Sequence, residues 1–142
     1  MQFNFLTIND YDDVVNLWKK AGLKFKPNGR DSIESIKKQL ELFPYMFLGA
    51  FMDGKLVGVA IITDDGRKGW INRLAVDPDY RRKGVAKGII SKAEEIFRNK
   101  GIYLFAALIE DWNVASQELF KSMGYVKHTD IFYFSKRDSD EY

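Results

Sequence analysis

The sequence predicts an α/β fold in which helices pack on a mixed sheet, and two observations carry this prediction. Three apolar runs at residues 46–52, 55–63 and 70–76 are separated only by short turns, as in an antiparallel meander. The last run leads through a glycine-containing turn into a helical pattern and then into a further apolar run, which is typical of a right-handed crossover between parallel strands. At 142 residues the chain fits a single domain, which we place at residues 1–137, with a frayed tail at 138–142.

The first part of the chain predicts one strand and two helices. The opening QFNFLTI alternates apolar and polar residues, which favours a strand with one buried face. Asn9 or Asp10 is placed to cap the next segment, whose apolar residues recur at helical spacing until Gly22 ends it. Asp31 or Ser32 is placed to cap a second helix of the same kind.

Turn residues and periodicity define the remaining elements. Asp53-Gly54 suits the positive φ angles of a two-residue turn and predicts a hairpin. The run WINRLAV is apolar enough to indicate burial on both faces of the sheet. A helix that starts at Val85 ends at Lys100-Gly101. The later expected elements are a strand at 103–109, a helix at 113–124 and an antiparallel pair of strands at 125–128 and 131–136.

Composition narrows the classes of function. Lys and Arg number 22 against 20 Asp and Glu, and a net charge of +2 favours neither a nucleic-acid nor a membrane partner. The absence of cysteine removes disulfides, thiolate metal sites and a cysteine nucleophile. His128 is the only histidine and stands in no metal-ligand pattern, so we expect no metal. The opening residues lack a signal-peptide pattern and no apolar run is long enough to span a bilayer, so the sequence predicts a cytoplasmic protein.

The most informative segment is RRKGVAKG, which joins the last strand of the meander to the next helix. Free backbone N–H groups and a partial positive charge at a helix start favour binding of an anion such as phosphate. Gly84 permits close approach of the backbone to a ligand, and Ala86 leaves room beside the first turn. The pattern GxxxxGK[ST] of a P-loop is absent. The turn carries four cations, Arg81, Arg82, Lys83 and Lys87.

This turn resembles the [RQ]xxGx[GA] loop with which the GNAT family of acyl-CoA N-acyltransferases binds the pyrophosphate of coenzyme A. The segment from Asn113 to Tyr125 is similar to that family's NxxAxxLYxxxGF element, and the order of elements resembles the family over nearly the whole chain. The resemblance implies the GNAT acyl-CoA N-acyltransferase fold, with seven strands and four helices in the order given above. It also implies an acyltransferase that moves the acetyl group of acetyl-CoA directly to a primary amine of a small molecule, a peptide N-terminus or a lysine.

The resemblance implies a set of site residues as well. A bulge near Asn72 and Arg73 would expose the N–H of Leu74, which would polarise the thioester carbonyl. Asn113 would contact the pantetheine arm while capping its own helix, and Lys121 would either reach the 3′-phosphate or remain a solvated surface residue. The implied contacts to coenzyme A are Leu74, Ala75, Val76, Arg81, Arg82, Lys83, Gly84, Val85, Ala86, Lys87, Asn113, Phe120 and Lys121.

Two positions depart from the family pattern. Phe120 stands where the family often has a tyrosine that serves as general acid, and Leu108 stands where one branch has a glutamate. Glu110 and Asp111 are then the nearest candidates for a general base, and of the two we choose Glu110, because Asp111 is better explained as a cap of the next helix; the alternative for Glu110 is a solvated strand end. The departures leave an alternative function open, a non-catalytic coenzyme A-binding sensor or regulatory module. A nucleic-acid module, favoured by the RRK run and by the basic loop at residues 23–30, ranks third.

The acceptor is the least constrained partner. The expected loop between the first two helices is basic because it contains Lys24, Lys26 and Arg30, which would favour an acidic acceptor such as a carboxylate-bearing amine. The same cations are also explained as solvated surface residues. The family resemblance makes a homodimer plausible.

Overall fold

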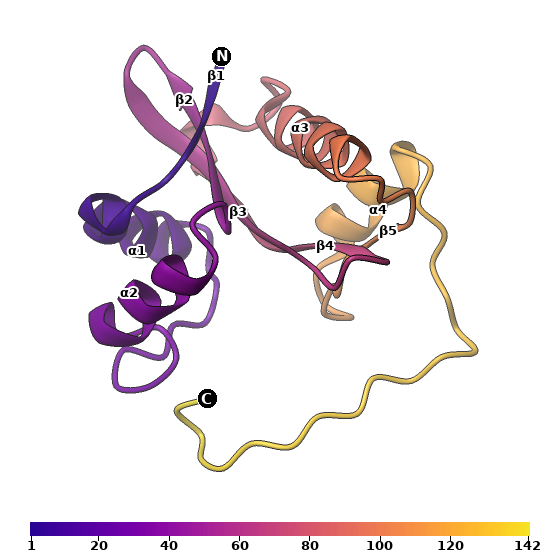
Figure 1. Ribbon diagram of the computed structural model, residues 1–142. Helices are drawn as coiled ribbons and strands as arrows, with labels where there is room; N and C mark the ends of the chain where they lie inside the picture. The colour runs from indigo at the N-terminus through magenta and orange to yellow at the C-terminus, as the bar shows by residue number, and fades with distance from the viewer.

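The computed structural model describes all residues from 1 to 142 and confirms the mixed α/β class (Figure 1). A five-stranded sheet has the order β1-β2-β3-β4-β5, antiparallel except for the parallel pair β4 and β5. The elements in chain order are β1 (Gln2–Phe5), the short 3-10 helix η1 (Ile8–Asp10), α1 (Tyr11–Lys20), α2 (Ile33–Leu42), β2 (Phe47–Met52), β3 (Lys55–Asp64), β4 (Gly69–Val76), the 3-10 helix η2 (Pro78–Tyr80), α3 (Val85–Asn99), β5 (Phe105–Ala106) and α4 (Val114–Ser122).

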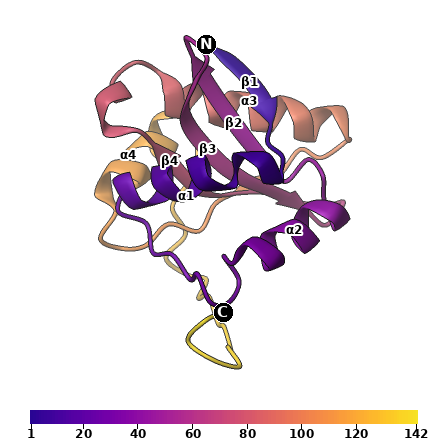
Figure 2. The same cartoon turned by 90° about the vertical axis from the view of Figure 1, so that its left-hand side faces the viewer.

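Helices cover both faces of the sheet. Figure 1 shows α1 and α2 on one side and α3 and α4 on the other, and Figure 2 shows α1 and α2 facing the viewer with α3 behind the sheet. Two apolar clusters result, one packed under α3 and α4 and one under α1 and α2. Ile71 of β4 belongs to the first cluster and Ala75 to the second, which confirms that β4 is buried on both faces.

The helix and turn signals of the N-terminal half are confirmed in position. Asp53 and Gly54 both have positive φ and join β2 to β3 as a two-residue turn, Gly22 has positive φ just after α1, and Ser32 caps α2 through its hydroxyl. Asp10 is the N-cap residue of α1, as expected, but its side chain makes no capping hydrogen bond to α1; the side-chain cap is made by Thr7 on the preceding η1. The Thr7 hydroxyl accepts from a backbone N–H while the Asp10 carboxylate accepts from the Thr7 N–H, so a capped 3-10 turn precedes α1.

The parallel strand is present but much shorter than predicted. The sequence placed a strand at 103–109, whereas β5 contains only Phe105 and Ala106, paired with the start of β4. Beyond that pair the two strands separate. There the Asn72 Oδ1 accepts a hydrogen bond from the Leu108 N–H at 3.0 Å, in place of backbone pairing between the strands. The crossover is confirmed, and β4 leaves β5 just before the segment that leads to α3.

The final antiparallel pair of strands, predicted at 125–128 and 131–136, is wrong. This segment follows α4 as a coil, drawn in yellow in Figure 1, and forms no strand. Its apolar side chains are exposed, with Phe134 at 92%. A two-stranded hairpin is only marginally stable by itself, and the two-residue β5 offers no long edge on which it could pair. Near the chain end, the Glu141 carbonyl accepts a hydrogen bond from the Arg30 N–H in the loop between α1 and α2.

Candidate functional site

The β4 strand contains the bulge that the sequence analysis expected near Asn72 and Arg73. In the pairing with β3, Val59 faces Ala75 and Ile61 faces Asn72, so two residues of β4, Arg73 and Leu74, lie opposite one residue of β3. Arg73 has a φ of 51°, a left-handed value that is uncommon for a residue with a side chain. Bulges of this kind redirect side chains and interrupt pairing, so the strand is irregular just where β5 has left it.

The turn before α3 presents a row of backbone amides without partners. Arg82 and Gly84 both have positive φ, and no side chain caps the helix at Gly84. The first intrahelical hydrogen bond is donated by the Gly88 N–H to the Gly84 carbonyl at 2.9 Å. The N–H groups of residues 82–87 precede that bond, and no carbonyl or side chain accepts from them. Such a concave row of amides at a helix start is a binding site for an anion.

The cations of this turn are not neutralised by the protein. None of them has a carboxylate within ion-pairing distance, and the Lys83 ammonium lies over the Tyr80 ring instead. A Cβ added at Gly84 would meet nothing within 4 Å, so open space lies in front of the turn. The positive field therefore adds to the helix dipole and is free to act on a ligand.

A cleft of about 520 Å³ runs between this turn, the end of α1 and the start of α4. Ten of the predicted coenzyme A contacts line it: Leu74, Ala75, Val76, Arg81, Arg82, Gly84, Val85, Ala86, Lys87 and Asn113. The structure therefore brings the bulge, the anion-binding turn and the cap of α4 together on one cavity. An elongated ligand with an anionic group fits these walls, and the diphosphate of coenzyme A matches the row of free amides.

The far wall is organised by the start of α4. Asn113 caps α4 by accepting the Ser116 N–H through Oδ1 at 3.2 Å, as the sequence predicted, and also lines the cleft. The Trp112 ring lines the cleft beside it and donates its indole N–H to the Glu110 carboxylate. Glu110 itself is exposed and is not among the residues that line the cleft. A role of Glu110 as base would therefore require a bridging water or a movement of its side chain.

Three predicted contacts lie off the cleft. Phe120 is 4% exposed and packs edge-on against the Tyr125 ring in the core, so its position gives no support to a role in cofactor binding. The Lys121 ammonium is 3.5 Å from the Glu118 carboxylate on the surface of α4, and Lys83 turns toward Tyr80. Their assignment to coenzyme A stays a prediction.

Sequence reasoning missed Asp77, which fixes the base of the anion-binding turn. Its side chain is buried, caps η2 by accepting the Asp79 N–H, and lies 3.4 Å from the ammonium groups of both Lys20 and Lys55. The hydrogen bond from Asp79 and these two cations hold the pKa of Asp77 below its ordinary value against the opposing effect of burial. The signal available in the sequence was the Asp-Pro step between the strand and RRKGVAKG.

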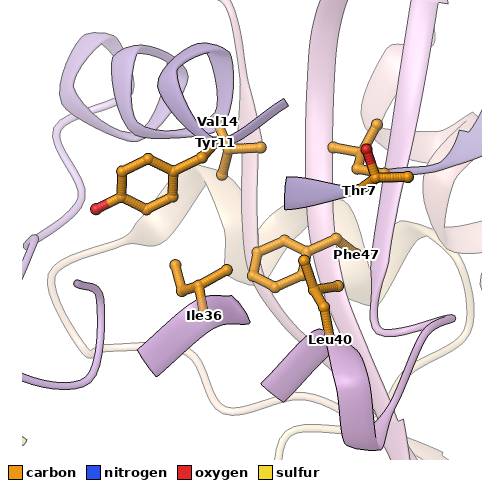
Figure 3. Close-up of a pocket in the computed structure, with 7 residues that line it drawn as sticks. Thr7, Tyr11, Val14, Ile36, Leu40 and Phe47 are labelled. Carbon is orange, nitrogen blue, oxygen red and sulfur yellow. The ribbon is translucent and has the colours of Figure 1, made fainter. Parts of the chain in front are cut away.

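Further cleft residues also escaped the sequence analysis. Their side chains come from the end of α1, from η2 and from the first turns of α4, which adjoin only in the folded chain: Ala21, Leu23, Tyr80, Trp112, Ala115, Ser116 and Leu119. A separate small cavity between α1, α2 and β2, lined by Tyr11, Val14 and Phe47 among others, measures about 10 Å³ (Figure 3). It has room for about one water molecule and is a packing defect rather than a ligand site.

Comparison with known proteins agrees with this geometry. A family model described as "Acetyltransferase (GNAT) family" matches residues 11–125, which covers most of the chain. The chain belongs to the GNAT acetyltransferase family. This GNAT protein is 27% identical to an acetyltransferase of Sodalis glossinidius over 137 residues, 96% of this chain and 95% of the relative. That membership confirms the predicted class, an acetyl-CoA-dependent N-acetyltransferase.

Solved structures share the fold. The crystal structure of PaiA N-acetyltransferase from Thermoplasma acidophilum in complex with coenzyme A superposes with a TM-score of 0.79, at 22% identity over 91% of this chain and 92% of that one. Aminoglycoside N-acetyltransferase AAC(6')-Iy in complex with CoA gives a TM-score of 0.73, at 20% identity over 96% and 94% of the two chains. No group of three or more acidic or histidine side chains in this GNAT protein is placed to hold a metal ion. None of its helices combines the length and apolar character needed to cross a bilayer.

Proposed function

We propose that this GNAT protein transfers the acetyl group of acetyl-CoA directly to a primary amine while both substrates occupy the cleft. The observation that carries the proposal is the row of unbonded amides at residues 82–87, opening into the same cleft as the β4 bulge. The amides and the surrounding cations would bind the diphosphate, and Asn113 would hold the pantetheine amides. Both reactants would then be positioned for direct attack, which can supply many orders of magnitude in rate.

In this proposal the chain contributes one hydrogen-bond donor to the thioester and one base. The Leu74 N–H, in the bulge, donates to the thioester carbonyl oxygen and stabilises the charge that develops there. The protonated acceptor amine first loses one proton to Glu110, directly or through a water. A C–N bond then forms at the carbonyl carbon and the C–S bond breaks. The nitrogen loses its second proton to solvent, and the leaving sulfur takes a proton from solvent, because Phe120 has none to give.

The alternative function is a coenzyme A-binding sensor without catalysis. It is favoured by the two departures from the family pattern, since Phe120 is buried in the core and Leu108 is apolar. Release of free thiol from acetyl-CoA in the presence of a panel of amines separates the two functions. Amine-dependent release supports the transferase, whereas saturable binding of coenzyme A without such release at any pH from 6 to 10 supports the sensor.

We also propose that the protein forms a homodimer. The support is the coil after α4, whose apolar side chains Val126, Ile131, Phe132 and Phe134 are exposed and have no partner within the chain. Light scattering after gel filtration tests this, and a monomer at high protein concentration contradicts it. A single domain over residues 1–137, a frayed tail and a cytoplasmic location stay predictions.

A further inference from the structure

Arg73 borders the cleft at the bulge of β4, beside the lining residue Leu74, without itself forming part of the cleft wall. The Arg73 Nη2 donates a hydrogen bond to the carbonyl of Lys24 at 2.6 Å. Lys24 follows Leu23, which lines the opposite wall of the cleft. Its guanidinium carbon lies 4.3 Å from the centroid of the Trp18 ring. Arg73 therefore spans β4 and the loop after α1, and the stacked ring holds its guanidinium in a defined orientation.

The charge of this guanidinium is not neutralised. No carboxylate lies within 4.0 Å of it, and the single hydrogen bond to Lys24 uses one of the five N–H donors that an arginine carries. Nε is buried without an acceptor. Burial lowers the pKa of Arg73, and the nearby Arg30 adds a like charge. Asp31 is the one acidic group that acts on Arg73, but its carboxylate is buried and accepts the Lys26 N–H instead.

A purely structural role explains this arrangement poorly. If Arg73 served only to tie the loop after α1 to β4, a neutral donor would satisfy the Lys24 carbonyl without a half-buried, unpaired charge. A ligand carboxylate would pair with this charge through the Nη donors that the Lys24 carbonyl leaves free. Three further cations, Lys24, Lys26 and Arg30, lie in the same loop and none of them has an ion-pair partner. Their field draws anions toward this end of the cleft.

We propose that Arg73 binds the carboxylate of the acetyl acceptor, so that the acceptor class is primary amines that carry a carboxylate, as amino acids do. The proposal rests on the proposed function, because it assigns the second substrate of the same cleft. A planar guanidinium matches a carboxylate through two parallel hydrogen bonds, which fixes orientation as well as charge. With its carboxylate on Arg73, an acceptor directs its amine along β4 toward Leu74. The Asn72 side chain holds Leu108 on that side, two residues before Glu110.

Pairs of amines that differ only in one carboxylate test the proposal. We would measure kcat/KM with acetyl-CoA for lysine against cadaverine, arginine against agmatine, and tyrosine against tyramine. The wild-type protein should prefer the carboxylate member of the accepted pairs by roughly 10- to 100-fold, the range expected for a charge-assisted hydrogen bond. Arg73→Gln should abolish this preference, mainly by raising KM for the carboxylate-bearing amine. Arg73→Lys should restore part of it, because an ammonium keeps the positive charge but lacks the two parallel N–H donors of a guanidinium.

Arg98→Gln is the matched control. Arg98 also places its guanidinium over an aromatic ring, 5.0 Å from the centroid of Phe105, but it lies on α3 away from the cleft and is bonded to Glu94. The preference should be unchanged in this variant. The dissociation constant of coenzyme A should be the same in wild type, Arg73→Gln and Arg98→Gln, which separates loss of the acceptor from loss of the fold.

Three results would overturn the proposal: acetylation of carboxylate-free amines alone, equal use of both members of each pair by the wild type, or an equal loss for both members in Arg73→Gln. The last result would make Arg73 a loop anchor. If no amine is acetylated, the proposed transfer reaction is rejected, but binding of a carboxylate by Arg73 can still be tested without turnover. Lysine and not cadaverine should then raise the melting temperature of the coenzyme A complex in an Arg73-dependent manner, and absence of that difference would also overturn it.

Discussion

The variants Gly84→Asp and Gly84→Asn place side chains of nearly the same shape, one charged and one neutral, at the anion-binding turn. Comparing them measures the electrostatic contribution of this turn to coenzyme A binding. Gly84 has a φ of 78°, and a Cβ there meets nothing within 4 Å, so either side chain fits and the strain is that of a left-handed residue, about 1 kcal/mol. Asn tolerates this conformation and has nearly the shape of Asp. Both variants should fold, with similar losses of a few degrees in melting temperature.

The two variants should differ sharply in binding. Two unit charges about 5 Å apart at an effective dielectric constant of about 20 repel by about 3 kcal/mol. The Asp variant should therefore bind coenzyme A about 100-fold more weakly than the Asn variant, as measured by isothermal titration calorimetry in low salt. A difference of less than threefold between Asp and Asn would refute the reasoning, because it would mean that the diphosphate does not lie in front of Gly84.

The remaining predictions concern a base and two titrating groups. Glu110→Gln should lower kcat by roughly 10²- to 10⁴-fold with no change in coenzyme A affinity. Asp111→Asn, which changes the exposed neighbouring residue, should leave kcat nearly unchanged. Equal effects of the two variants in steady-state kinetics would reject Glu110 as the base. Asp77 has a lowered pKa, so its stabilisation is complete above about pH 4, the ordinary aspartate pKa, and is lost as pH falls through the folded value. Asp77→Asn should accordingly lower the free energy of unfolding at pH 7 by about 1–3 kcal/mol, as measured by urea unfolding, and this loss should shrink as the pH is lowered. A loss that does not change with pH would contradict the role assigned to Asp77. Burial and the hydrogen bond from its hydroxyl to Glu94 raise the pKa of Tyr125, so its stabilisation is present below about pH 10 and is lost as pH rises further. Tyr125→Phe should therefore lose stability at neutral pH and unfold with a weaker alkaline dependence than wild type, and identical alkaline profiles would disprove the assignment.

Local signals in the sequence were sufficient for most of the fold. The Asp53-Gly54 turn, the Ser32 cap and the glycine after α1 each act within a few residues, so their conformations follow from the residue types alone. The anion-binding turn was predictable for the same reason, because its strand, glycine and helix are contiguous. The bulge at Arg73 came from family resemblance, since neither Arg73 nor its neighbours carry a residue that demands a positive φ.

The errors fall where structure depends on pairing partners. The strand expected at 103–109 is cut to two residues because β4 bends away at its bulge, and the two strands expected after α4 do not form although IFYFSK has high intrinsic strand preference. The cleft residues contributed by α1 could not be assigned from the sequence for a similar reason. Leu23 and Leu74 are far apart along the chain and meet only because α1 packs on the sheet.

The most direct test of the account compares binding of coenzyme A with binding of pantetheine, which lacks the diphosphate, by calorimetry on the wild-type protein. If the amides of residues 82–87 and the cations around them bind the diphosphate, coenzyme A should bind at least 100-fold more tightly than pantetheine, and its affinity should fall steadily as salt is added. Equal affinities for the two ligands, or no detectable binding of coenzyme A, would contradict the account.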